Sequence, residues 1–171
     1  MKRFVVIVFA LALAWSSCSE NTPEPEENQE TRDSIINVSG FSQELSLGFP
    51  VEFARSNKPR ARYNEMTGEI EITAGEGFHI ICTEESLSIS QLKEELETDL
   101  LFSYRYETEN PNELVFVQVL PEGTELSYHF IQRLEFPGIT IIARSDQSGE
   151  FTKQQVQTMM SVLANSKPSA S

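Results

Sequence analysis

Two segments of the chain place apolar residues at the spacing of an amphipathic helix, and each segment begins with a capping box. In such a box a Ser or Thr side chain and a Gln side chain three residues later each accept a hydrogen bond from the other residue's backbone. The boxes run from Ser88 to Gln91 and from Thr152 to Gln155. The apolar stripes consist of Ile89, Leu92, Leu96 and Leu100 in the first segment, and of Val156, Met159, Met160 and Leu163 in the second. The pattern predicts two helices, each with one apolar face for packing.

The stretch between these helices contains four runs that are typical of strands. They span residues 101–107, 114–120, 125–136 and 139–144. Short turns separate them, and short turns join antiparallel neighbours, so the runs predict a four-stranded meander. Upstream, residues 69–74 and 78–84 flank Gly75-Glu76-Gly77 and predict a hairpin. The predicted fold class is α+β, an antiparallel sheet with an N-terminal hairpin, then strand, helix, four strands and helix, and with the two amphipathic helices packed on it.

Residues 45–53 also alternate between apolar and polar side chains. Pro50 lacks a backbone N–H, so this run is expected to form an edge strand. A basic cluster follows, and its composition and Pro59 predict a loop. The cluster contains Arg55, Lys58, Arg60 and Arg62. The loop is either a contact site for phosphates or acidic sugars, or a solvated loop that balances nearby carboxylates.

The first residues have the layout of a secretory signal peptide. Lys2 and Arg3 form a positive start, and Phe4 to Trp15 follow without a charge. A run of about a dozen apolar residues is too short for a membrane-spanning helix but suits a signal peptide, so residues 1–17 are excluded from the fold. The alternative is cleavage after Ala14, which also provides the small residues that signal peptidase requires.

Ser16, Ser17 and Cys18 resemble the lipobox of bacterial lipoproteins, although Trp15 stands where that pattern prefers an aliphatic residue. The resemblance implies that Cys18 becomes the first residue of the mature protein and carries lipid on its sulfur and its new amino terminus. Three acyl chains would anchor the protein firmly, because each buried methylene contributes roughly 0.8 kcal/mol. After cleavage at Ala14, Cys18 is instead a free thiol that is able to pair with Cys82.

Residues 18–34 form the anchor and an acidic linker. The stretch from Ser19 to Asp33 contains no aliphatic or aromatic side chain, so it is expected to be extended and solvated. An acidic run after the lipidated cysteine resembles the export signal of surface lipoproteins in one Gram-negative phylum. Asp33, Ser34 and Ile35 resemble the O-glycosylation pattern found there, with Ser34 as the modified residue. The alternative is a plain spacer.

The chain is strongly acidic, with 13 Lys and Arg residues against 26 Asp and Glu residues and a net charge of −13. Without the signal peptide and the linker, residues 34–171 still carry a net charge of −10. Such a body repels phosphate backbones, which argues against nucleic-acid binding. Residues 35–164 are enough for a single domain, and residues 165–171 are expected to be a flexible tail.

Candidates for catalysis are few. The sequence contains no Walker loop, metalloprotease helix, serine-hydrolase elbow or Cys-x-x-Cys pair. Its two histidines are His79 and His129, both on predicted strands, and two isolated histidines are fewer than the three or four ligands of a zinc site. No metal or cofactor is therefore expected. Cys82 is expected to be a buried and inert small hydrophobe.

The preferred hypothesis is a non-catalytic, membrane-anchored envelope lipoprotein. It would reside at the outer membrane, on its periplasmic face or at the cell surface, and bind an envelope protein or glycan. The alternative is a small envelope hydrolase that uses His79 or His129. A third hypothesis is a soluble periplasmic protein with a bond between Cys18 and Cys82.

Overall fold

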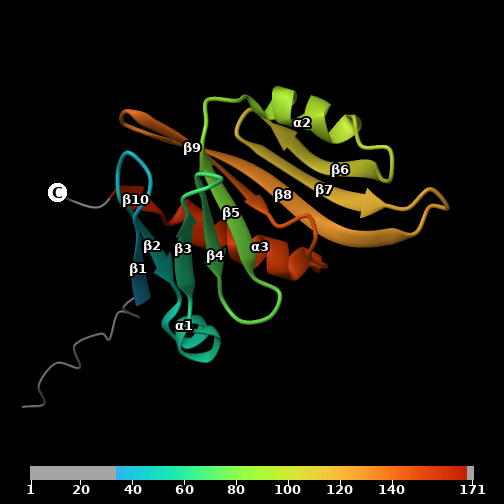
Figure 1. Cartoon of the computed structure of the whole chain (residues 1–171). Coiled ribbons are helices and arrows are strands. Elements are labelled where there is room, and N and C mark those ends of the chain that lie inside the picture. The colour runs from blue at the N-terminus through green and yellow to red at the C-terminus, as the bar shows by residue number, and fades with distance from the viewer. Residues whose placement is uncertain (1–33, 169–171) are drawn as a thin grey trace, which may run out of the picture. The chain divides into compact units, whose positions relative to one another are not determined.

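The computed structural model describes residues 34–168, which lie within one compact unit of the chain, Thr31–Ser171. Strands that pair in antiparallel fashion and three helices make up these residues, so the predicted α+β class is confirmed. In chain order the elements are β1 (Ser34–Val38), β2 (Leu45–Phe49), α1 (Val51–Asn57), β3 (Arg60–Asn64), β4 (Glu69–Thr73), β5 (His79–Glu84), α2 (Ile89–Glu97), β6 (Ser103–Asn110), β7 (Glu113–Val119), β8 (Glu125–Phe136), β9 (Ile139–Ser145), α3 (Lys153–Ala164) and β10 (Lys167–Pro168) (Figure 1).

The strands form one large and one small sheet. The large sheet has the order β3-β4-β5-β9-β8-β7-β6, and each neighbouring pair is antiparallel. Strands β6 to β9 follow one another as a meander, and β9 then pairs with β5, which joins the meander to the β3–β5 segment. The small sheet has the order β1-β2-β10.

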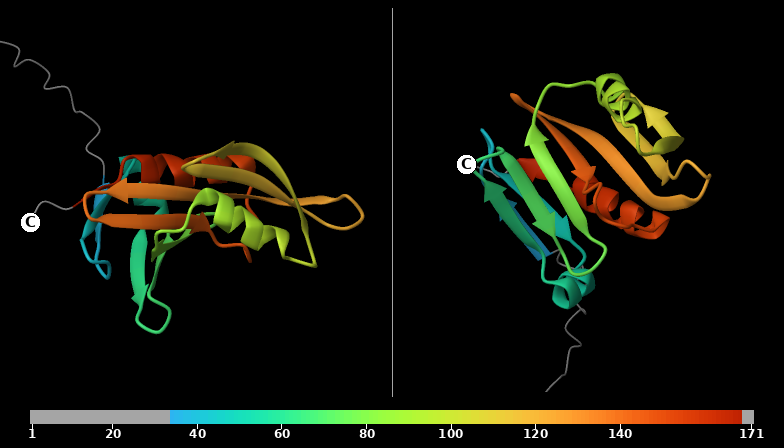
Figure 2. Two further views of the ribbon diagram at one scale, coloured as in Figure 1. Left: turned by 90° about the horizontal axis from the view of Figure 1, so that it is seen from above. Right: turned by 45° about the vertical axis from the view of Figure 1, so that its right-hand side comes forward.

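The helices α2 and α3 lie on opposite faces of the large sheet (Figure 2). Alternate residues of β8 and β9 therefore point into different cores. Phe130 and Ile141 belong to the core beside α3, whereas Ile131 and Ile142 belong to the core beside α2. Because both faces of these strands are buried, their sequences are apolar along most of their length.

The two capping boxes form where the sequence predicts them. The Ser88 N–H donates to Gln91 Oε1 at 3.0 Å, and the Gln91 N–H donates to Ser88 Oγ at 3.3 Å. The Thr152 N–H likewise donates to Gln155 Oε1 at 2.8 Å, and the Gln155 N–H donates to Thr152 Oγ1 at 3.3 Å. Each box satisfies backbone donors at a helix start, so α2 and α3 begin at Ile89 and Lys153.

The predicted place of Leu100 on the apolar face of the first helix is wrong. Helix α2 ends at Glu97, with Thr98 as its C-cap, and the Leu100 side chain is 96% exposed. Asp99 explains the early end, because its Oδ1 accepts the Leu101 N–H at 2.7 Å and turns the chain toward β6.

The strand predicted for residues 45–53 also needs correction. Strand β2 ends at Phe49, and Pro50 becomes the N-cap of helix α1. Pro50 has no N–H for a strand ladder and already has a suitable φ of −52°, so it favours the start of a helix. Phe49 and Phe53 are four residues apart, and their rings stack with centroids 6.1 Å apart. A separation of four residues fits one face of a strand and also one turn of a helix, so the apolar pattern did not reveal that Phe49 ends a strand and Phe53 lies in a helix.

Paired strands reach both ends of the described range. Ser34, predicted to lie in the linker, pairs with Phe49 at the start of β1. Lys167 and Pro168, predicted to lie in a flexible tail, pair with Ser46 and Leu45 as β10. Within residues 34–168 no helix has the length and apolar character needed to cross a membrane.

Gly77 provides a test of how the β4–β5 turn holds the start of α3. Its φ is +74°, and a Cβ added there would overlap the side-chain amide of Gln155, which belongs to the capping box of α3. We expect Gly77→Ala to lower the free energy of unfolding by about 2–3 kcal/mol, because left-handed strain and loss of the cap each cost about 1 kcal/mol or more.

Gly68→Ala is the matched control for this substitution. Gly68 has a φ of +72° and open space around the added Cβ, so it should show the backbone strain alone. Urea denaturation of both variants measures the difference. Equal losses would show that Gln155 moves aside without cost.

Candidate functional site

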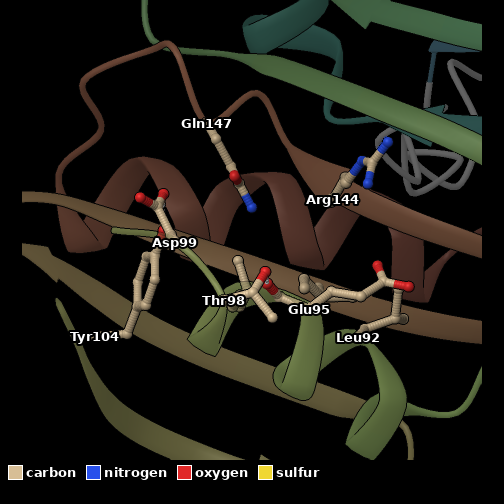
Figure 3. A pocket seen from close by; sticks show the side chains of 9 residues that line it. Leu92, Glu95, Thr98, Asp99, Tyr104, Arg144 and Gln147 are labelled. Carbon is tan, nitrogen blue, oxygen red and sulfur yellow. Dashed lines mark hydrogen bonds between the residues drawn. The ribbon is translucent and has the colours of Figure 1, made fainter. Parts of the chain in front are cut away.

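A pocket of about 320 Å³ lies between α2 and the sheet face that this helix partly covers. It is near the lower end of the size range of small-ligand pockets. Its lining comes from α2, the α2–β6 connection, strands β6, β8 and β9, and the loop after β9 (Figure 3). The lining residues are Leu92, Glu95, Leu96, Thr98, Asp99, Tyr104, Ile131, Arg144 and Gln147.

The apolar part of the pocket belongs to the core beside α2. Leu92 and Leu96 face the sheet from the helix, and Ile131 meets them from β8; all three side chains are buried. These residues are rigidly packed, so they give the pocket a fixed apolar floor.

Asp99 and Tyr104 form one polar wall. The Tyr104 hydroxyl donates to Asp99 Oδ2 at 2.8 Å, and the Leu101 N–H donates to Asp99 Oδ1 at 2.7 Å. These two hydrogen bonds, the backbone bond foremost, lower the pKa of Asp99. Burial, assisted by the Asp99 charge, raises the pKa of Tyr104 to about 12. The wall thus holds an ionised carboxylate beside a neutral phenol at neutral pH.

Arg144 and Gln147 form the opposite wall. Arg144 Nη2 lies 3.3 Å from Glu69 Oε1, so a carboxylate on β4 already offsets its charge. Gln147 follows Asp146, which His79 holds in place, with 3.1 Å between His79 Nδ1 and Asp146 Oδ2. Figure 3 shows the Gln147 side chain directed toward α2, across the pocket from Thr98.

Contacts with β6 hold α2 in position over the sheet. Lys93 Nζ lies 2.8 Å from Glu109 Oε2 and 4.5 Å from the centre of the Tyr106 ring. These contacts fasten one side of the helix to the sheet edge, and the bond between Asp99 and Tyr104 ties the connection after the helix to β6. The other side of the helix, which carries Glu95, borders the pocket.

The predicted basic loop is not a loop. Arg55 lies in α1 and pairs with Glu52 at 3.1 Å between Nη1 and Oε1, and Lys58 is the C-cap of α1 with a φ of +47°. Arg60 and Arg62 lie in β3, opposite Thr73 and Glu71 of β4. A short helix and an edge strand therefore divide the four basic residues, because residues 60–64 pair with β4, and all four side chains are exposed. None of them lines the pocket beside α2.

The two histidines lie on strands that are not neighbours, since β9 separates β5 from β8. His129 is fully buried between Phe116 and Phe151, with 3.0 Å between its Nδ1 and Ser145 Oγ. Burial lowers the pKa of His129 to about 4. Among residues 34–168 no group of three or more His, Cys, Asp or Glu side chains is arranged to hold a metal ion.

Within the described residues, the other predicted sites do not line the pocket beside α2. Cys82 is buried in β5, and burial raises the pKa of its thiol to about 12, as expected of an inert cysteine. Ser34 is half-buried at the start of β1. Cys18, the predicted lipidation site, lies outside the described residues.

The sequence reasoning missed the pocket beside α2. Arg144 and Gln147 follow the apolar run of β9, and Asp99 and Tyr104 lie around a turn whose position was assigned incorrectly. No pattern in the sequence pointed to it, because the exposure of Leu100 and Leu101, which marks the end of the helix, is visible only in the structure.

Comparisons with known proteins do not identify a relative. No protein-family model, curated protein or solved structure matches the chain.

Proposed function

We propose that this protein is an envelope lipoprotein, anchored through Cys18, whose folded domain is a non-catalytic binding module. The observation that carries the binding role is the pocket beside α2. It combines an apolar floor with polar groups that hydrogen bonds hold in place, which is the general character of ligand sites in proteins.

The alternative, a small hydrolase using His79 or His129, has less support. A general base needs a ring nitrogen within reach of its substrate. His129 is fully buried and contacts Ser145 through Nδ1. His79 has Nδ1 beside Asp146, and its Nε2 is buried without a hydrogen-bond partner in the described part of the chain. In both rings Nε2 is buried and Nδ1 is engaged by a neighbouring side chain, so the binding role is favoured.

The location follows from the start of the chain. A lipid on Cys18 and an acidic, proline-containing linker would hold the domain at the outer membrane, on its periplasmic face or at the cell surface. The net charge of −10 on residues 34–171 disfavours a nucleic acid, and the proposed location leaves an envelope protein or glycan as the partner.

The anchor is tested by labelling cells with radioactive palmitate. We expect wild-type protein to carry the label and Cys18→Ala to lose it, because position 18 supplies the acylated sulfur and amino terminus. Cys82→Ala is the matched control and should keep the label, since Cys82 is buried in β5. A label that persists in Cys18→Ala would contradict lipidation at Cys18.

Protease treatment of intact cells, with a tag at the C-terminus, tests on which side of the membrane the domain lies. Loss of the tag from intact cells places the domain at the cell surface. Protection until the outer membrane is opened places it on the periplasmic side. A disulfide between Cys18 and Cys82 on non-reducing gels would instead support the soluble periplasmic protein.

A further inference from the structure

The charges around the pocket beside α2 do not cancel. Glu95 and Asp99 line it from the helix side and Arg144 lines it from β9. Arg144 is paired with Glu69, whereas Glu95 has no ion pair within residues 34–168. The pocket thus has an unbalanced negative charge on its α2 side.

Asp99 is positioned to receive a further donor. It accepts hydrogen bonds from the Tyr104 hydroxyl and from the backbone N–H groups of Leu101 and Phe102, and a carboxylate has about four acceptor positions. These bonds fix its orientation and leave room for one further donor, so little order is lost when a ligand binds.

Uncharged acceptors lie near the carboxylates. The Gln147 side chain has no hydrogen-bond partner in the part of the chain that the structure describes, and it points across the pocket toward Thr98 (Figure 3). Thr98 Oγ1 donates to the Glu95 carbonyl at 2.7 Å, which leaves its lone pairs free. The amide oxygen of Gln147 and the hydroxyl of Thr98 are therefore available to accept hydrogen bonds.

The floor and the rim add apolar contacts of two kinds. Leu92, Leu96 and Ile131 are more than nine-tenths buried, so the floor gives a chain of methylene groups a small apolar contact. Beside the rim, Leu100 is 96% exposed and Leu101 is 71% exposed. An exposed leucine pair next to a pocket suits contact with the surface of another protein better than with a free small molecule.

We propose that this pocket receives a lysine side chain from a partner protein. The stem lies on the floor of Leu92, Leu96 and Ile131, and the ammonium group lies among Glu95, Asp99 and Gln147. The exposed leucines contact the partner's surface around that lysine. This assignment rests on the proposed binding role of the domain and names the chemistry of its partner.

The first experiment compares three small probes on the whole mature protein in detergent, with 13C-labelled Leu and Ile methyl groups. The probes are the N-acetyl, N-methylamide derivatives of lysine, norleucine and glutamate. Norleucine has the aliphatic stem without the charge, and glutamate has the opposite charge. We expect the lysine probe alone to shift the methyl signals of Leu92, Leu96 and Ile131 in a saturable manner.

Variants then separate the charges. Asp99→Asn keeps an acceptor for Tyr104, and we expect it and Glu95→Gln to raise the dissociation constant of the lysine probe by about threefold to tenfold. Glu94→Gln is the matched control, because Glu94 is exposed on the same helix but does not line the pocket, and it should bind as wild type. Arg144→Gln should bind more tightly, because it removes the one positive charge of the lining.

Three results would overturn the assignment. Equal shifts with norleucine would mark an apolar site, binding of glutamate that is lost in Arg144→Gln would mark an anion site, and no shift with any probe would mark an empty crevice. The proposed location is tested separately, since palmitate labelling at Cys18 is independent of probe binding. If the protein carries the palmitate label but does not bind the lysine probe, the lysine assignment is wrong and the lipid anchor is still supported.

Discussion

Phe116→Ala is expected to lower the free energy of unfolding by about 3–5 kcal/mol, the range for removal of a fully buried aromatic ring. Phe116 is 0% exposed and lies in the core beside α2. Its ring contacts those of Tyr104 at 5.4 Å, Tyr106 at 6.3 Å and His129 at 5.6 Å between centroids. Guanidinium denaturation measures the loss, and a change below about 1 kcal/mol would contradict this packing.

Phe130→Ala is the matched control for this variant. Phe130 is equally buried but faces the core beside α3, so its removal should cost a similar free energy. Only Phe116→Ala removes the ring that supports Tyr104 and, through it, Asp99. Of the two variants, it alone should change the methyl signals of Leu92 and Leu96 at temperatures where both proteins are folded.

Acidification from pH 6.5 to pH 4 is expected to remove about 3 kcal/mol of stability through His129. Burial lowers the pKa of this histidine from 6.5 to about 4, which corresponds to roughly 1.4 kcal/mol for each pH unit. Between pH 6.5 and pH 4, His129 is mostly protonated in the unfolded chain and mostly neutral in the folded protein. The stability that the neutral ring provides is thus present above pH 6.5 and lost as the pH falls toward 4.

Substitution of His129 isolates this effect. His129→Phe should flatten the dependence of the unfolding free energy on pH between 6.5 and 4.5, whatever the stability of the variant itself. Paired carboxylates act at lower pH, because hydrogen bonds from Ser42 and Lys153 lower the pKa values of Glu84 and Glu107. Their contribution is lost only below about pH 4.5. An unchanged slope in His129→Phe would show that the ring is protonated in the folded protein.

The helix starts and several strands followed from local patterns. The boxes at Ser88 and Thr152 form as expected, because a capping box involves only neighbours in sequence. The range predicted for β8 agrees with its observed bounds, Glu125–Phe136, since turns of Pro and Gly flank it. Residues 50–57 were predicted incorrectly because Phe49 and Phe53 fit both a strand and a helix until Phe78 packs beside them.

Local sequence patterns could not predict the candidate site, because its lining residues come from distant parts of the chain. The pocket joins Asp99 and Tyr104, which are near each other in sequence, to Arg144 and Gln147, which are forty or more residues away. Only the return of β9 between β8 and β5 brings them together. Which side of α2 faces Glu109 and which borders the pocket also depends on where the helix docks on β6.

The sequence by itself determined the properties that depend on composition and on neighbouring residues. These are the acidic charge, the α+β class, the helix starts and the expectation of a lipid anchor at Cys18. The tertiary structure alone decided which face each strand residue occupies, the burial of His129 and the charge pattern around the pocket. The physical reason is that desolvation and charge pairing depend on groups that are distant in sequence. These groups approach one another only when the sheet packs between its two cores.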